Sequence, residues 1–252
     1  TPVRIAGPAA GAAAMRTGDD RRGNVVFGTL ANCAMGSTPW GTCLSCEENF
    51  DSYFNGLEQA TPDQQRYRIR KNGSGYRWHE HDSRFDVATE PNEANRFGWV
   101  VEIDPWKPTQ APVKRTALGR FKHECATVAL ASDGRVVVYM SDDQAFEYLY
   151  KFVSRDRFDA SSPARGGALL DVGTLYVARF DADGKGRWLA LEHGRNGLGE
   201  SSGFADQADI LIRTRQAADL VGATKMDRPE WIAVHPHSGE VYCTLTNNRQ
   251  RV

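Results

Sequence analysis

Short runs of apolar and β-branched residues recur along the whole chain, and polar segments containing glycine close most of them. Runs of this length, bounded by turn residues, are typical of β-strands rather than of helices. Turn signals such as Ser132-Asp133-Gly134 separate neighbouring runs, which is the pattern of β-hairpins. The sequence therefore predicts an all-β fold built mainly from antiparallel sheet. The predicted strands span residues 24–30, 98–103, 125–130, 135–140, 174–180, 188–191, 231–234 and 240–245.

Two segments, residues 123–143 and 229–248, share the same order of features. Each has a glutamate at its second position, continues as a strand, turns at a glycine, returns as a second strand and ends in a polar doublet. Such a repeat predicts blades of a β-propeller, in which the inner strand of each blade begins near the central channel. Glu124 and Glu230 should then approach one axis. We expect residues 1–252 to form a single β-propeller domain.

Two other segments depart from the strand pattern. Residues 206–221 have helical spacing, with an acidic start and Gly222 at the stop, so they predict a helix. Residues 58–95 are polar, lack clean alternation and predict a long insertion from a blade. The insertion contains His79-Glu80-His81-Asp82, which could bind a metal, but a solvated loop is the better interpretation.

Composition removes several classes of function. The 31 basic and 32 acidic residues are interspersed and give a net charge of −1, so no nucleic-acid-binding footprint is present. No apolar run is long enough for a membrane span, and motifs for dinucleotides, a phosphate-binding P-loop or a serine hydrolase are absent. The five cysteines are an odd number, so we expect at least one free thiol. Cys43 and Cys46 form one C-x-x-C, which without a second pair is weak evidence for structural zinc.

The stretch TPWGTCLSCEENF, residues 38–50, places a thiol directly before two carboxylates, Cys46, Glu47 and Glu48. Carboxylates suit calcium, magnesium or ferric iron, whereas a thiolate selects softer or redox-active metals, so together they would suit a mixed-metal cluster. On a strand Cys46 and Glu48 share one face and Glu47 the other, so a site using all three requires the strand to end or bulge. A buried structural cysteine beside two exposed glutamates is at least as good an interpretation of the spacing.

Basic residues precede glutamates in the two repeated segments. His123 lies directly before Glu124, and Arg228 lies two residues before Glu230. Each pair combines a residue able to bind an anion with a candidate metal ligand, although ordinary surface ion pairs would look the same. The doublets Asp142-Asp143 and Asn247-Asn248 could add oxygen ligands, but turn residues are the favoured interpretation.

Longer motifs resemble the PhoX family of bacterial alkaline phosphatases, in order and over nearly the whole chain. They are TPWGTCLSCEENF, FGWVVEIDP, LGRFKHE, FEYLYKFVS, LLDVGTLYVARF and KMDRPEWIAVHP. The resemblance implies a β-propeller exported by the twin-arginine route to the periplasm or the medium. It also implies a longer protein, whose remaining part would supply further blades and further acidic ligands, so that residues 1–252 would hold an incomplete β-propeller.

The resemblance implies hydrolysis of phosphate monoesters by a cluster of iron and calcium ions. The positions matching the family's metal ligands are Cys46 with Glu47 and Glu48 beside it, Glu124, and Glu230. His123 and Arg228 match positions near the bound phosphate.

The leading hypothesis is therefore a metal-dependent phosphomonoesterase that acts on small-molecule phosphate esters as a monomer. Arg228 would clamp phosphoryl oxygens, and His123 would hydrogen-bond the phosphate or assist the leaving group. One alternative is a non-catalytic propeller that calcium stabilises and that serves as a binding module. Another is a phosphodiesterase or lactonase, because propellers host several metal hydrolases and the fold alone does not choose among them.

Overall fold

The computed structural model describes residues 1–73 and 75–251 and shows a molecule built predominantly from β-strands. The described strands form one sheet of six strands, one of five and one of two. The prediction of an all-β fold arranged as an incomplete β-propeller is confirmed. The strands are β1 (Pro2–Ala6), β2 (Val25–Phe27), β3 (Asn32–Ser37), β4 (Cys43–Glu47), β5 (Val100–Ile103), β6 (Val113–Arg115), β7 (His123–Leu130), β8 (Arg135–Asp142), β9 (Leu149–Arg157), β10 (Gly173–Phe180), β11 (Gly186–Ala190), β12 (Pro229–Val234) and β13 (Val241–Leu245).

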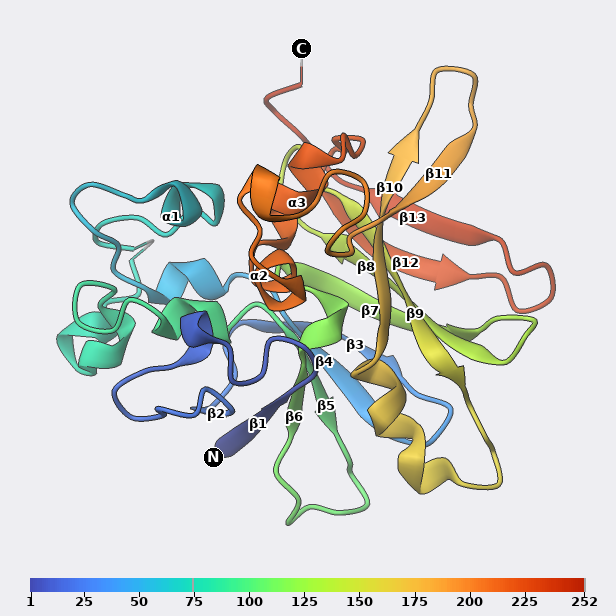
Figure 1. Ribbon diagram of the computed structural model, residues 1–252, viewed down its shortest axis with the longest axis horizontal. Helices are drawn as coiled ribbons and strands as arrows, with labels where there is room; N and C mark the ends of the chain where they lie inside the picture. Colours follow the sequence, from blue (N-terminus) through green and yellow to red (C-terminus); the bar gives the residue numbers. More distant parts are fainter. Residues whose placement is uncertain (74, 252) are drawn as a thin grey trace.

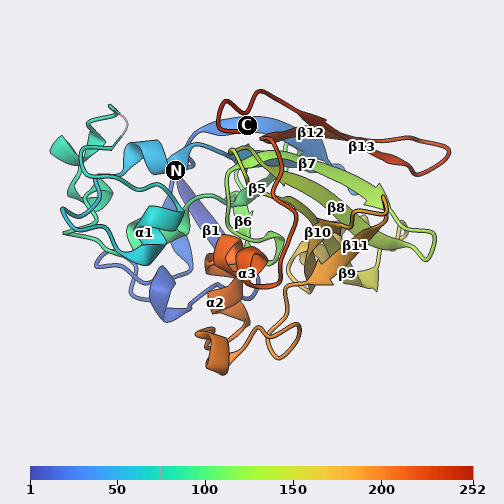
Figure 2. The same ribbon diagram turned by 90° about the horizontal axis from the view of Figure 1, so that it is seen from above.

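The three sheets meet around β7. The first sheet has the order β2-β1-β6-β5-β4-β3, with β1 and β6 parallel, and the second is the antiparallel meander β11-β10-β9-β8-β7. β3 and β4 pack against β7 on one side, and the β12-β13 hairpin packs against β7 and β8 (Figures 1 and 2). Gly36 allows this approach, because a Cβ atom there would lie 1.9 Å from the carbonyl oxygen of Ala126 on β7.

Each predicted strand segment overlaps an observed strand. The hydrophobic pattern did not predict β1, β3, β4, β6 and β9, although a strand was considered for the residues of β4. β3 has the sequence NCAMGS and buries only Gly36, so it lacks the apolar alternation on which the prediction depends. β3 is nevertheless important, because it brings Cys33 to the meeting point of the sheets.

The segment predicted as one helix forms two, α2 (Gln207–Ile212) and α3 (Thr214–Leu220). The break is at Arg213, whose backbone angles are not helical, φ −106° and ψ 43°. The Thr214 hydroxyl donates to the Leu211 carbonyl oxygen at 2.7 Å and so satisfies a backbone acceptor that a continuous helix would use. The acidic start is confirmed, because the Asp206 side chain accepts from the Asp209 N–H at 2.8 Å.

The predicted insertion, residues 58–95, contains helical turns and no strand among its described residues. It holds α1 (Pro62–Arg66) and extends from the sheets at the left of Figure 1. Residue 74, inside this segment, and residue 252 lie outside the described part of the chain. The short 3-10 helices are η1 (Ala13–Met15), η2 (Phe50–Tyr53), η3 (Trp78–Glu80), η4 (Ser83–Phe85), η5 (Glu93–Arg96), η6 (Thr116–Leu118), η7 (Pro163–Leu170) and η8 (Glu200–Ser202).

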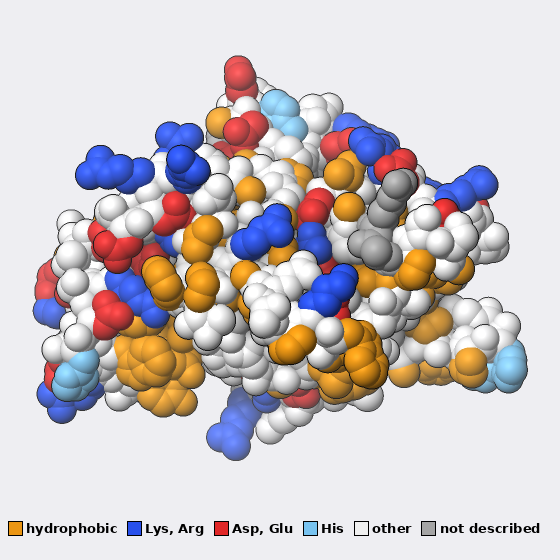
Figure 3. Space-filling model, turned by 90° about the horizontal axis from the view of Figure 1, so that it is seen from below, with side chains coloured by type: hydrophobic (Ala, Val, Ile, Leu, Met, Phe, Trp, Pro, Cys, Tyr) orange, Lys and Arg blue, Asp and Glu red, His pale blue; other side chains and the backbone are white. Residues whose placement is uncertain are grey.

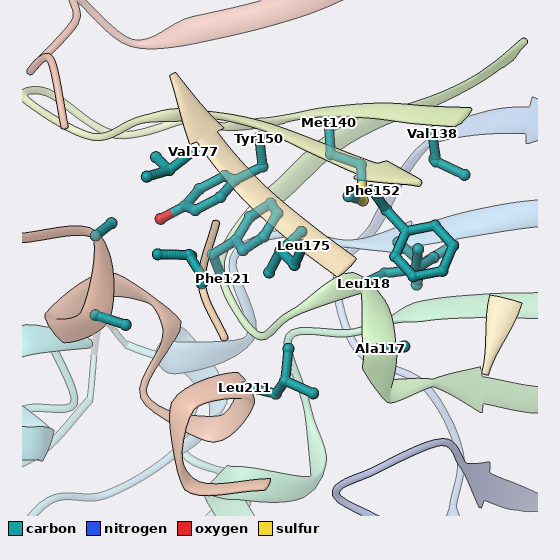
Figure 4. Close-up of a cluster of buried hydrophobic side chains, with 14 of the residues drawn as sticks. Ala117, Leu118, Phe121, Val138, Met140, Tyr150, Phe152, Leu175, Val177 and Leu211 are labelled. Atoms are coloured by element: carbon teal, nitrogen blue, oxygen red, sulfur yellow. The ribbon is translucent and has the colours of Figure 1, made fainter. Parts of the chain in front are cut away.

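The main hydrophobic core lies between the five-stranded sheet and the helices. Side chains of β8, β9 and β10 face η6 and α2 there (Figure 4). A second core joins the six-stranded sheet to the insertion. Basic and acidic side chains are interspersed on the face shown in Figure 3, as the sequence predicted. No helix of residues 1–73 and 75–251 is long and apolar enough to cross a lipid bilayer.

Candidate metal centre and anion cavity

Five metal-competent side chains gather where the sheets meet. Cys33, Glu48 and Glu124 place one ligand atom each within 4.8 Å of the others, and Glu124, Asp143 and Glu230 do the same. Glu124 belongs to both groups, so the five form one continuous acidic cluster. As the repeat predicted, Glu124 and Glu230 approach each other from two different sheets.

Irregular strand pairing accompanies the cluster at three places. In β7, His123 pairs with Asp142 but Cys125 pairs with Ser141, so Glu124 is an extra residue with no partner of its own. The register also shifts between Pro229 and Ile232, around Glu230, and between Asn32 and Met35, around Cys33. A bulge lets a side chain leave the strict alternation of a strand, and bulges are enriched next to active sites. The two flanking residues of Glu124, His123 and Cys125, are both fully buried.

The acidic side chains raise one another's pKa values. Burial and the charges of Glu124 and Asp143 raise the pKa of Glu48 to about 7. Burial and the charge of Glu230 also raise the pKa of Glu124. Burial and Glu124 raise the pKa of the Cys33 thiol to about 12, and its Sγ lies 3.4 Å from a carboxylate oxygen of Glu124. Carboxylates crowded in this way favour a bound cation, because its charge removes their mutual repulsion.

An open cavity of about 320 Å³ adjoins the cluster. Glu48 and Asp143 belong to both the cavity wall and the cluster. Arg228 donates from Nε and Nη2 to the two carboxylate oxygens of Asp143, each at 2.9 Å, and this hydrogen bonding raises the Arg228 pKa. Lys122 lies 2.8 Å from Asp51 and is largely buried. The basic side chains that line the cavity are Arg68, Lys122, Arg228 and Arg249.

A cavity lined by four cations beside a cluster of carboxylates and a thiol is suited to an anion bound next to metal ions. The family model for the alkaline phosphatase PhoX matches residues 1–252. The chain belongs to the PhoX family. A comparison with curated proteins gives no match.

A solved PhoX structure has the same fold over this chain. The structure of Pseudomonas fluorescens PhoX in complex with vanadate, a transition state analogue, matches with a TM-score of 0.97 and 56% sequence identity. The match covers 100% of this chain and 45% of that protein, so the chain spans less than half of the length of its solved relative.

Glu47 does not join the acidic cluster, which corrects its prediction as a metal ligand. Its carboxylate is fully buried and lies 2.8 Å from Lys114 Nζ. It also accepts backbone N–H bonds from Leu30, Gly98 and Trp99 at 3.0 to 3.1 Å. The predicted alternation of faces explains this result, because Glu47 points away from the side that Cys46 and Glu48 share.

His123 lies in the core rather than in the cavity, which corrects its prediction as a phosphate ligand or proton donor. Its ring is fully buried, stacks on Phe121 at 3.7 Å between centroids and donates from Nε2 to the Gly119 carbonyl oxygen at 2.9 Å. Burial lowers the pKa of His123 to about 3, so the ring is neutral at ordinary pH. The bulge at Glu124 explains the placement, because it lets Glu124 face the cluster while His123 faces inward.

Cys46 is fully buried beside the cluster, among core residues that include Leu44 and Ala126. Burial and the neighbouring groups Cys125, Cys33 and Glu124 raise the pKa of its thiol. Its sulfur belongs to neither group of ligand atoms among the described residues, so its role as a metal ligand stays a prediction. All five cysteines are free, in agreement with the odd count.

Sequence reasoning missed Cys33, and it preferred a turn role for Asp143. The doublet Asp142-Asp143 was a usable signal, and the structure gives its two members opposite roles: Asp142 is fully buried and Asp143 faces the cluster. Nothing in the local pattern marks Cys33, because only the pairing of β3 with β4 and its packing on β7 bring it into place. The His79 to Asp82 segment contributes to no group of metal ligands among the described residues.

Proposed function

We propose that the protein is a metal-dependent phosphomonoesterase that releases inorganic phosphate from small phosphate esters. The observation that carries the proposal is that two residues belong to both sites. Glu48 and Asp143 are members of the acidic cluster and also line the cavity that contains the basic residues. An ester held in this cavity would present its phosphoryl group to the cluster. Membership of the PhoX family and the vanadate complex of the Pseudomonas fluorescens relative support the same reaction.

The cluster residues fit the metals that the family resemblance implies. Glu48, Glu124, Asp143 and Glu230 offer the hard oxygen ligands that calcium and ferric iron prefer, and the Cys33 thiol offers a ligand for iron. When bound, such ions act as Lewis acids on phosphoryl oxygens and help to activate the attacking oxygen. We propose that these five residues hold the iron and calcium ions.

The basic residues of the cavity bind and orient the phosphate. Arg228 donates from Nε and Nη2 to Asp143, and its Nη1 has no partner among the described residues. Nη1 is therefore free to donate to a phosphoryl oxygen. Asp143 fixes the plane of this guanidinium group, which keeps its geometry ready before the substrate arrives. Lys122 adds a positive charge that is only 8% exposed, and poor solvation strengthens its attraction for an anion.

The test is Arg228→Met in the full-length protein, assayed with p-nitrophenyl phosphate. Loss of one positioned cation at a phosphate is expected to lower kcat/KM by about a hundredfold, with metal content nearly unchanged. Arg155→Met is the matched control, because Arg155 is exposed and pairs with Asp156 on β9. Turnover of a phosphodiester or a lactone in preference to the monoester would contradict the proposal, and so would calcium binding without any hydrolysis.

Export to the periplasm or the medium follows only from the family resemblance, and we keep it as part of the proposal. Fractionation of the native host should place phosphatase activity outside the cytoplasm. Activity confined to the cytoplasm would contradict it. The monomeric state also stays a prediction, which sedimentation of the full-length protein would test.

A further inference from the structure

A fully buried ion pair lies directly behind the cavity and has no place in the chemistry proposed above. Arg215 on α3 donates from Nε to one carboxylate oxygen of Asp142 at 2.8 Å and from Nη2 to the other at 2.5 Å. Both side chains are 0% exposed. Removing two charges from water costs several kcal/mol for each ion, so a buried pair of this kind is poor evidence for a gain in stability. A role in setting geometry is the better explanation.

Asp142 connects this pair to two residues of the cavity wall. Its Oδ1 accepts the backbone N–H of Lys122 at 3.3 Å. The next residue, Asp143, donates its backbone N–H to the Lys122 carbonyl oxygen at 3.1 Å. The backbone of Lys122 is therefore bonded both to the buried Asp142 carboxylate and to the backbone of Asp143. Lys122 and Asp143 are a cation and a carboxylate of the proposed site.

Arg215 also bonds to other segments around the cavity. Its Nη1 donates to the Arg66 carbonyl oxygen at 3.2 Å and lies 3.5 Å from Oε1 of Gln144, which lines the cavity. The guanidinium group lies 5.3 Å from the centre of the Tyr67 ring. A planar fork with five donors can make all these contacts at once, whereas the ammonium group of a lysine cannot.

We propose that Arg215 is a positioning residue for phosphate binding. It holds Asp142, and through Asp142 it holds Lys122 and Asp143 in the arrangement that an incoming phosphate meets. This inference rests on the proposed function, because Arg215 itself lines neither the metal cluster nor the cavity and would affect phosphate only through the residues of the proposed site. It predicts that the planar guanidinium group of Arg215 with its several N–H donors, and not only its charge, determines the affinity for phosphate.

The experiment compares Arg215→Lys with Arg96→Lys in the full-length protein. Arg96 is the matched control because it is only 3% exposed and pairs with Asp20 and Glu93, each at 3.4 Å, yet it lines neither the cavity nor the cluster. The readouts are kcat and KM for p-nitrophenyl phosphate, Kd for orthophosphate by calorimetry, and iron and calcium content. All are measured at a temperature well below both Tm values.

We expect Arg215→Lys to raise Kd for orthophosphate and to lower kcat/KM, each by about tenfold to about a hundredfold, because small displacements of positioned groups have effects of this size. Arg96→Lys should change Kd and kcat/KM by less than about twofold, even if it lowers Tm as much as Arg215→Lys does. Equal phosphate affinity in the two variants would overturn the inference and leave the proposed function standing.

If Arg215→Lys does not fold, Asp142→Asn replaces it, since it keeps the shape of the side chain and removes its charge. Asp142→Asn is expected to weaken orthophosphate binding by a similar factor, and unchanged binding would overturn the inference. If the unmodified protein neither hydrolyses the ester nor binds orthophosphate, the proposed function fails and the inference fails with it.

Discussion

Adjacent residues with the same charge have different roles in this protein. Glu47 and Glu48 are consecutive, yet Glu47 forms a buried ion pair with Lys114, whereas Glu48 lies in the acidic cluster. Sequence reasoning identified the alternation of faces but could not tell which glutamate faced the metal site. That choice depends on Lys114, which lies on another strand and is brought close only by the fold.

At the residue scale, we predict that Glu47→Gln destabilises the protein by about 3–5 kcal/mol, because it leaves the buried Lys114 ammonium group without a counter-charge. Urea unfolding of the metal-free protein measures the effect. Glu48→Gln is the matched comparison, and it should lower metal content without a comparable loss of stability. Similar unfolding free energies for the two variants would contradict the assigned roles.

The two candidate thiols give a second prediction at this scale. Cys33→Ser should lower iron content by more than about half, because Cys33 lies within ligand distance of Glu48 and Glu124. Cys46→Ser places a hydroxyl in the core and should chiefly reduce stability. Iron analysis of both variants shows whether Cys33 or Cys46 is the thiolate ligand. Iron retained in Cys33→Ser and lost in Cys46→Ser would assign the thiolate ligand to Cys46, as the family resemblance implies.

At the scale of elements, the sequence predicted strands better than it predicted their pairing. The apolar runs indicated most strands, and the repeat of strand, turn and strand indicated that Glu124 and Glu230 meet. The register shifts at β3, β7 and β12 could not be predicted, because a bulge depends on the partner strand as well as on local sequence. These shifts place Cys33 and Glu124 in the cluster and His123 in the core.

Gly36 gives a prediction at the element scale. Gly36→Ala would place a Cβ atom 1.9 Å from the Ala126 carbonyl oxygen, so β3 must move away from β7. We expect a loss of about 1–3 kcal/mol in stability, together with lower iron content because Cys33 is carried on β3. Gly199→Ala is the control, because no atom lies within 4 Å of its Cβ position and its φ is 179°. If Gly36→Ala changes neither the free energy of unfolding nor the iron content, the position of β3 does not depend on this contact.

At the scale of the whole molecule, the ligands of the proposed site come from all three sheets. Cys33 and Glu48 belong to or follow strands of the first sheet, Glu124 and Asp143 belong to or follow strands of the second, and Glu230 lies in the third. Metal ions held by these residues would add to the packing contacts and hydrogen bonds, such as that from the Thr127 hydroxyl to the Ile232 carbonyl oxygen, that already join the sheets around β7. The solved relative is more than twice as long as this chain.

Iron and calcium content, measured per molecule together with phosphomonoesterase activity, tests the proposed metal centre most directly. The full-length protein and its Glu124→Gln variant would be purified without chelators, because Glu124 belongs to both ligand groups. We predict iron and calcium with activity in the unmodified protein, and loss of metal and of at least about a hundredfold in kcat/KM in Glu124→Gln. Full metal content and full activity in Glu124→Gln would contradict a metal centre at the meeting point of the three sheets.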